Sequence, residues 1–168
     1  MKRTPLKKVS PNKIKKPKTH NASWWQKKCD EKMQDINRRL NKRCEVDPNL
    51  LCQTGHHFVT KALSSWLRYK FENLISISFS KHFEHHTKND PHVMDVVIQK
   101  RGREWVEWIE SHRRLEQKTG IDYYKNIFEW LTEIDKMIDT GDMNGDIELM
   151  KDKSYGNRKF IRIGDKMA

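Results

Sequence analysis

The chain has 168 residues, of which only 35% are hydrophobic, so it can build one domain with a modest core but not comfortably two. No apolar run approaches the roughly 20 residues that cross a bilayer, and the first residues lack the apolar segment of a secretory signal, which argues against a membrane protein and predicts a cytoplasmic location. Thirty-four Lys and Arg against 23 Asp and Glu give a formal charge of +11, which favours a polyanionic partner.

Residues 1–22 form a basic arm. It carries eight Lys and Arg, no acidic residue, and the prolines Pro5, Pro11 and Pro17. Such a segment buries too little apolar surface to offset its ordering entropy, so we expect it to be disordered. We interpret it as an electrostatic arm that lies along phosphates; the alternative is a solubilising tail.

A first helix is predicted from Ser23 to about Leu40. Ser23 and Gln26 have the spacing of a capping box, and apolar residues recur every three or four positions. A turn follows around Asp47-Pro48-Asn49. The three cysteines, Cys29, Cys44 and Cys52, are odd in number and form no CxxC pair, which argues against a disulfide framework.

Two short strands and a helix are predicted in the middle of the chain. Residues 50–52 are apolar and indicate a first strand that ends near the following histidines, while residues 74–78 alternate like a strand with one buried face. Residues 80–87 are compatible with a short helix. These three elements make up a small core at about residues 50–88.

Three further helices are predicted downstream. Asp90-Pro91 has the pattern of an N-cap before a helix that reaches about Lys100, and Gly102 interrupts it. A second helix is predicted over 103–118, ended by Thr119-Gly120, and a third over 122–138. Residues 139–168 form a polar tail. The fold class is therefore α+β and mainly helical, with one domain at 23–138 in which a hairpin and helix pack with flanking helices.

Six of the eight histidines lie between positions 56 and 92. On the predicted helix His82 and His86 are i and i+4, so they point the same way, as two ligands of one metal must. His85 is three residues from His82 and is the alternative second ligand. His86 is favoured because its side chain points in a direction around the helix axis closer to that of His82. A lone histidine is more often a surface or hydrogen-bonded core residue than a metal ligand. The hypothesis of a metal site therefore depends on several histidines occurring together.

His56 and His57 are adjacent at the end of the first predicted strand, where successive side chains point to opposite sides. One of them could face a metal that polarises a phosphate oxygen, while the other removes a proton from the attacking water. Asn73, just before the second strand, has an amide able to hold that base in one tautomer. Its simplest alternative reading is a turn residue.

The ordered set GHH…N…H…H, with Gly55-His56-His57, Asn73, His82 and His86, resembles the HNH, or ββα-metal, nuclease motif. The resemblance implies that His56 and His82 are metal ligands, that His57 is the general base and that Asn73 is its orienter. His86 is similar to the additional histidine ligand of colicin-type DNases. The resemblance also implies hydrolysis that leaves 5′-phosphate and 3′-hydroxyl ends.

The chain departs from many HNH proteins, which carry two cysteine pairs for a structural zinc. Cys44 and Cys52 could be remnants of the first pair, but Ser78 and Lys81 stand where the second would be, so no structural four-Cys zinc is expected. One divalent catalytic metal is expected instead. Three nitrogens without a carboxylate suit Zn, Ni, Co or Mn better than Mg, although Mg stays open.

A second resemblance, to phage NinG (Rap) recombination nucleases, spans about residues 3 to 130. It rests on RTPLKK, the helix that begins SWW, the segment LRYKFENL and the helix GREWVEWI. It implies a phage DNA endonuclease, acting in the cytoplasm of an infected bacterium, that cuts branched recombination intermediates. Beside the site, Arg68 is the first candidate for a phosphate contact, and Lys61 and Lys70 are the others.

Three other functions stay open. One is a sequence-nonspecific or nicking DNase, because no recognition module is present. Another is a noncatalytic DNA-binding protein that keeps a metal-stabilised histidine cluster for folding. The third is an RNA-binding or acidic-protein-binding module in which the histidines are incidental. Paired cuts at a junction need two active sites, which favours a homodimer, although no heptad or interface stripe supports one.

Overall fold

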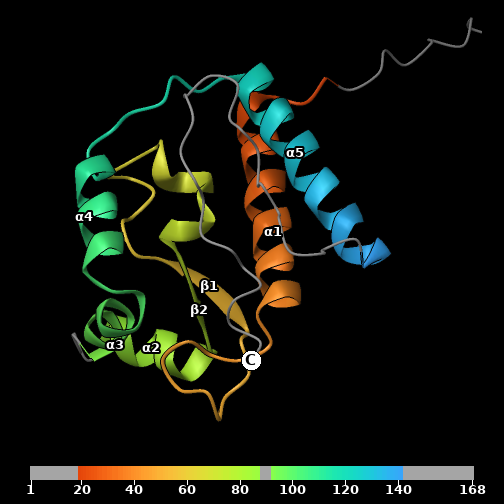
Figure 1. Ribbon diagram of the computed structural model, residues 1–168. Helices are drawn as coiled ribbons and strands as arrows, with labels where there is room; N and C mark the ends of the chain where they lie inside the picture. Colours follow the sequence, from red (N-terminus) through yellow and green to blue (C-terminus); the bar gives the residue numbers. More distant parts are fainter. Residues whose placement is uncertain (1–18, 88–91, 142–168) are drawn as a thin grey trace, which may run out of the picture.

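The computed structural model describes residues 19–87 and 92–141. Within them the chain is a mainly helical α+β fold, as the sequence predicts. Figure 1 shows a two-stranded sheet at the centre, with α1 and α5 on one side and α2, α3 and α4 on the other. The elements in chain order are α1 (Ala22–Leu40), β1 (Thr54–His57), η1 (Leu67–Tyr69), η2 (Phe71–Asn73), β2 (Leu74–Ile77), α2 (Phe79–Thr87), α3 (His92–Arg101), α4 (Arg103–His112) and α5 (Ile121–Thr140).

The sheet is an antiparallel pair of β1 and β2, in which His56 lies opposite Ile75 and His57 opposite Leu74. All four residues of β2 are buried, so the prediction of one buried face is wrong. The reason is that helices cover both faces. Leu74 packs in the core formed with α1 and α5, whereas Ile75 and Ile77 pack in the core formed with α3 and α4.

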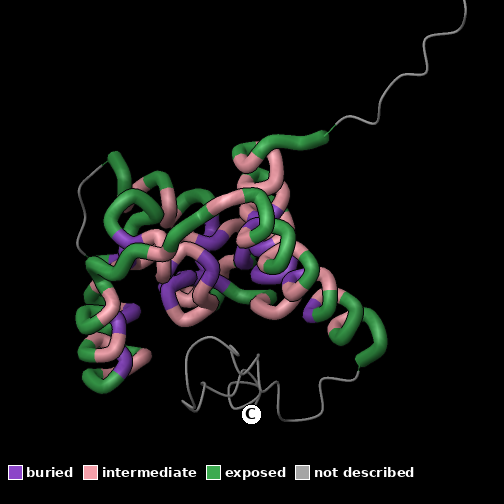
Figure 2. Tube along the Cα trace, turned by 90° about the horizontal axis from the view of Figure 1, so that it is seen from above, coloured by how far each residue is buried: buried purple, intermediate pink, exposed green. Residues whose placement is uncertain are grey.

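The first core lies between α1 and α5, which run side by side (Figure 1), and Figure 2 shows that the buried residues lie in the interior of the described part of the chain. The prediction that the apolar residues recurring along the first helix face a core is confirmed. Its buried residues are Cys29, Met33, Ile36, Tyr69, Leu74, Tyr124, Leu131 and Ile134. Asp135 of α5 forms ion pairs with Lys32 and Arg39 of α1 at the edge of this core. The paired helices thus form one packed layer against the sheet.

The second core joins the sheet to α3 and α4. Val93 and Val97 of α3, and Trp105 and Ile109 of α4, are buried against β2 and the loop before it. The Trp105 Nε1–H also donates to the carbonyl of Glu72 over 3.0 Å. The tryptophan therefore packs in the core and also holds the backbone before β2.

The start of α1 differs from the sequence prediction. Its N-cap is Asn21, whose side chain accepts from the Trp24 N–H over 3.0 Å, and not Ser23. The Gln26 side chain donates to the Tyr124 hydroxyl over 2.7 Å instead of closing a capping box. Asparagine is as good an N-cap as serine, and the helix is capped by Asn21, two residues before Ser23.

The first strand also differs, because β1 contains the two histidines and does not include residues 50–52. Leu51 forms only an isolated bridge with Arg43. The turn at residues 47–49 is confirmed, since the Leu50 N–H donates to the Asp47 carbonyl over 3.0 Å.

Helix α4 ends at His112, six residues before the predicted end. The Ser64 hydroxyl shares its proton between the carbonyls of His112 and Leu115, at 3.2 and 2.8 Å, where the chain leaves the helix. Gly120 then begins α5 as its N-cap. Gly102 separates α3 from α4 with a φ of 83°, which favours glycine.

Parts of the sequence predictions lie outside the described residues, namely the Asp90-Pro91 helix start, most of the arm at 1–22 and most of the tail at 139–168. The last helix reaches Thr140, so the tail's first two residues are helical. Over residues 19–87 and 92–141, no helix is long and apolar enough to cross a membrane.

Candidate metal centre and catalytic histidine

The strand β1 sends its two histidines to opposite sides of the sheet. His56 shares a face with Ile75, on the side of α2 and α3, while His57 shares a face with Leu74, on the side of α1. This separation is what the period of a strand predicts for adjacent residues. Each histidine therefore has its own surroundings.

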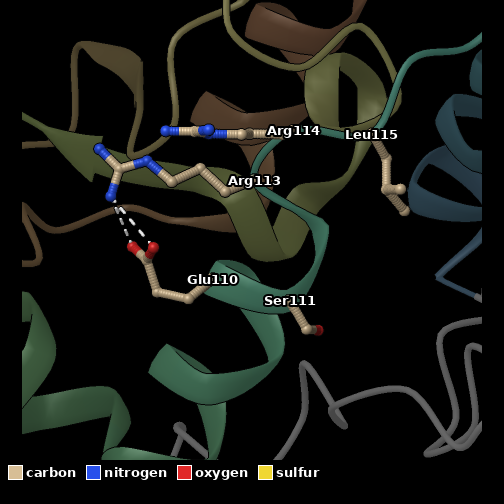
Figure 3. Close-up of a pocket in the computed structure, with 5 residues that line it drawn as sticks. All are labelled: Glu110, Ser111, Arg113, Arg114 and Leu115. Carbon is tan, nitrogen blue, oxygen red and sulfur yellow. Dashed lines mark hydrogen bonds and ion pairs between the residues drawn. The ribbon is translucent and has the colours of Figure 1, made fainter.

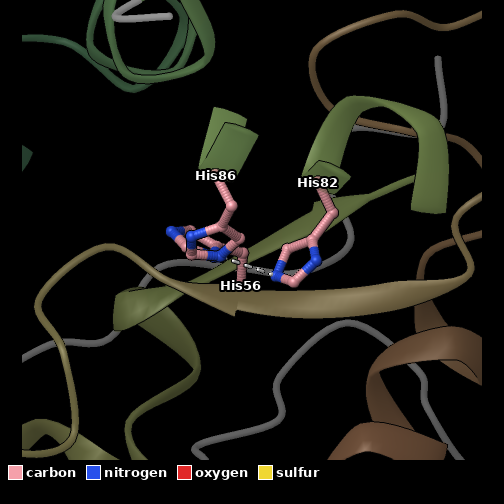
Figure 4. Close-up of side chains that lie close together, drawn as sticks. All are labelled: His56, His82 and His86. Atoms are coloured by element: carbon pink, nitrogen blue, oxygen red, sulfur yellow. Dashed lines mark hydrogen bonds between the residues drawn. The ribbon is translucent and has the colours of Figure 1, made fainter. Parts of the chain in front are cut away.

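On the α2 side three histidines converge (Figure 4). His82 and His86, one turn apart on α2, approach His56 of β1, and one ring nitrogen of each lies within 4.8 Å of the others. The Nε2 atoms of His82 and His86 are 3.3 Å apart. This group could hold a metal ion, and it is the ligand set predicted from the sequence.

His85 lies near the group without belonging to it. Its ring centroid is 4.9 Å from that of His56, but the three side chains whose ligand atoms converge are His56, His82 and His86. The choice of His86 over His85 therefore agrees with the geometry.

The ionisation of the cluster suits metal binding. Burial, followed by the neighbouring histidines, lowers the pKa of His56 to about 3, and burial with the same neighbours lowers the pKa of His82. Both imidazoles are neutral near pH 7, and neutral imidazole is the form that binds a metal. Protonation of the cluster would instead place like charges beside one another.

The donor set restricts the metal. Three imidazole nitrogens without a carboxylate among the converging atoms suit Zn, Ni, Co or Mn better than Mg. Three protein ligands also leave a coordination position for water or substrate, as catalytic zinc sites do. His86 is exposed, so the site is accessible from solvent.

On the other side of β1, His57 is held by the backbone. Its Nε2 lies 2.9 Å from the carbonyl oxygen of Arg68. Burial lowers the pKa of His57, although the Arg68 carbonyl acts in the opposite sense. Since a carbonyl only accepts, the neutral ring carries its proton on Nε2 and keeps the lone pair on Nδ1, which is the state of a general base.

A hollow of about 240 Å³ is lined by both histidines of β1. His57 lines it together with His56 and His82, so the candidate base and two candidate ligands border one space. The remaining lining residues are Gln34, Gly55, Thr60 and Lys61.

Asn73 does not hold His57 directly, which corrects the sequence prediction. The Asn73 side chain is fully buried, accepts from the Val59 N–H over 2.7 Å, and donates to the carbonyls of Val59 and Leu67, at 2.9 and 3.2 Å. It closes the loop that also carries the Arg68 carbonyl. Asn73 therefore fixes the partner of His57 and not the ring itself.

The predicted phosphate contacts have partners within the chain. The Arg68 guanidinium makes two hydrogen bonds to the Asp30 carboxylate, at 3.1 and 2.6 Å, and its side chain is only 16% exposed. Lys61 pairs with the same carboxylate at 3.3 Å but also lines the hollow. The Lys70 ammonium lies 4.7 Å from the centre of the Trp66 ring. Of the three, Lys61 is best placed beside the histidines.

Two supporting residues were missed by the sequence analysis. The Gln34 amide of α1 accepts from the Gly55 N–H over 2.6 Å and donates to the Gly55 carbonyl over 2.9 Å, so it pairs with the strand residue before His56. A Cβ at Gly55 would lie 2.7 to 2.8 Å from the Leu74 side chain. The glycine therefore lets the two strands and α1 approach closely, but no sequence signal links it to Gln34.

A second hollow, of about 350 Å³, lies at the end of α4 (Figure 3). Arg113 there pairs with both carboxylate oxygens of Glu110, at 2.8 and 3.1 Å. The C-terminal end of a helix is unfavourable for an anion, and none of the histidines of the cluster lines this hollow. It is therefore not the candidate site.

The three cysteines are buried and free, so over residues 19–87 and 92–141 neither a disulfide nor a four-Cys zinc site is present. Comparisons with protein-family models, curated proteins and solved structures gave no match to this chain. The functional argument therefore rests on the site.

Proposed function

We propose that the chain is a metal-dependent DNA endonuclease of the HNH (ββα-metal) class that hydrolyses phosphodiester bonds. The observation that carries the proposal is the hollow bordered by His57, His56 and His82, with His86 completing the group of converging nitrogens. A candidate base and a candidate metal centre share one space, as phosphodiester hydrolysis requires.

A divalent metal held by His56, His82 and His86 would polarise the scissile phosphate as a Lewis acid. His57 Nδ1 accepts the proton of the attacking water, and the Arg68 carbonyl, 2.9 Å from Nε2, stabilises the imidazolium that forms. Lys61, at the wall of the hollow, is a phosphate contact. By resemblance to HNH nucleases, cleavage leaves a 5′-phosphate and a 3′-hydroxyl.

The first experiment is a plasmid-nicking assay with the purified chain and Zn, Ni, Mn, Co or Mg, with a chelator control. We expect nicking in at least one metal and none with chelator. Absence of nicking with every metal would contradict the proposal. Bound metal without cleavage would instead favour a noncatalytic DNA-binding protein with a metal-stabilised histidine cluster.

The finer part of the proposal is the substrate: branched recombination intermediates of a phage, by resemblance to the NinG nucleases. The formal charge of +11 supports contacts with DNA phosphates that read no sequence, so binding should weaken steeply with salt. Cleavage rates on a Holliday junction, a flap and a linear duplex of one sequence decide the point. Equal rates on all three would leave a nonspecific nuclease.

A further inference from the structure

The helix that carries the candidate ligands also exposes two phenylalanines. Phe79 is 60% exposed and Phe83 66%, whereas the other three phenylalanines of the described residues, Phe58, Phe71 and Phe128, pack against the two cores. Helix α2 has no buried residue at all. A single exposed apolar residue is ordinary, but two aromatic rings one turn apart on a nine-residue helix form a patch.

The patch borders the candidate metal centre. Residues four apart share a helix face, so Phe79 and Phe83 form one pair and His82 and His86 form another. At 3.6 residues per turn, the two pairs are rotated by only about 60° from each other. A nucleotide whose phosphate lies at the histidines therefore has its base or sugar within reach of the phenyl rings.

Charge favours a nucleic acid as the occupant of this patch. The whole chain carries +11, and the one acidic side chain of α2, Glu84, pairs with Lys81 at 2.9 Å. A ligand that is anionic beside the histidines and apolar and flat beside the rings is a nucleotide strand. In a continuous duplex the base faces are already stacked on each other, whereas unpaired bases have free faces for aromatic side chains.

We propose that Phe79 and Phe83 stack on unpaired nucleotides next to the phosphate bound at the histidine cluster. The proposal rests on the nuclease function and narrows its substrate to DNA with unpaired bases at the cleavage point, such as a flap or a fork. Continuous duplex lacks the stacking contribution and is the poorer ligand.

The test compares DNA binding by the full chain carrying His57→Ala with the same chain carrying in addition Phe79→Leu and Phe83→Leu. Leucine keeps the patch apolar and removes the aromatic faces. The probes are a labelled single-stranded oligonucleotide, a flap and a duplex, with 2-aminopurine placed in the unpaired segment. We expect roughly 10-fold weaker binding of the first two probes and less quenching of 2-aminopurine, with duplex binding changed less than about twofold.

A matched control replaces Ile121 and Met137, two exposed apolar residues of α5, by alanine, which should leave all three affinities unchanged. Unchanged circular dichroism of the leucine variant excludes misfolding. Equal affinity of the leucine variant and its parent for unpaired DNA would overturn the proposal. So would a dimeric parent whose leucine variant is monomeric and binds DNA with the same affinity, because the patch would then be a dimer interface. The binding test does not depend on cleavage. A chain that nicks no plasmid would contradict the nuclease function, while the comparison of the leucine variant with its parent would still test the stacking proposal.

Discussion

The two sides of β1 are built in opposite ways, although they begin at neighbouring residues. His57 lies in a dense network in which its ring bonds the Arg68 carbonyl and the Arg68 side chain bonds Asp30 of α1. His56 faces α2, a short helix with no buried residue, and its ring lies beside the rings of His82 and His86. One side is fixed by the protein, and the other has a place for an ion.

This difference matches two chemical tasks. A general base must stand in one tautomer and orientation, and hydrogen bonds to buried backbone give it both. Metal ligands need only converge, because the metal itself orders them once it binds. The strand period explains how one dipeptide serves both tasks, since it separates adjacent side chains by the thickness of the sheet.

The largest expected effect is on metal binding. His82→Ala removes one of the three converging nitrogens. Loss of a residue that only hydrogen-bonds to a metal ligand typically lowers metal affinity roughly 10–100-fold, so we expect loss of a ligand itself to lower it further. His85→Ala, on the same helix, should change it less than about threefold. Titration calorimetry of both variants measures this. Equal losses would mean that the ligand set is wrongly assigned.

A smaller effect, on the free energy of unfolding, is expected from a change on the His57 side of β1. Asn73→Ala leaves the buried N–H and carbonyl of Val59 without the amide that bonds them, which should lower the free energy of unfolding by about 3 kcal/mol. Asn49→Ala, in the exposed turn, should cost less than about 0.5 kcal/mol. Urea unfolding of both variants is the measurement. A neutral Asn73→Ala would contradict the role of the amide in holding the loop.

The smallest effect concerns pH. The pKa of His56 is lowered from 6.5 to about 3 in the folded chain, so the unfolded chain binds more protons between these values. The contribution of His56 to the stability of the metal-free protein is therefore present above pH 6.5 and is lost as the pH falls toward 3, by roughly 1 kcal/mol between pH 7.5 and 5.5. His56→Asn should flatten this dependence in urea unfolding with chelator present. An unchanged slope would show that His56 is not buried neutral.

Local patterns were enough to predict most helices and the ligand pair on α2, whereas the choice of His56 over His57 as a ligand came from the resemblance to HNH nucleases. His82 and His86 are brought together by helical spacing alone, and the inward faces of α1 and α5 follow from their apolar repeat. The placement of His56 beside them needed the hairpin, whose second strand was indicated by the alternating pattern at residues 74–78, although β2 proves to be buried on both faces.

Contacts between distant segments could not be predicted in this way. Asp30 meets Arg68 across 38 positions, and Gln34 meets Gly55 across 21, because α1 lies against the sheet. At the end of α4 the His112 carbonyl accepts from Ser64, 48 residues earlier. Each of these is a hydrogen bond between distant segments, and single-sequence periodicity contains no information about it.

The central claim is the division of labour between His56 and His57, and the most direct test measures metal content and cleavage on the same preparation of His57→Ala. We expect the metal content of the parent chain and a single-turnover rate on plasmid DNA lower by about 10²- to 10⁴-fold, the usual contribution of a general base. A variant that cleaves at the parent rate, or one that loses its metal together with its activity, would contradict the assignment of the two histidines.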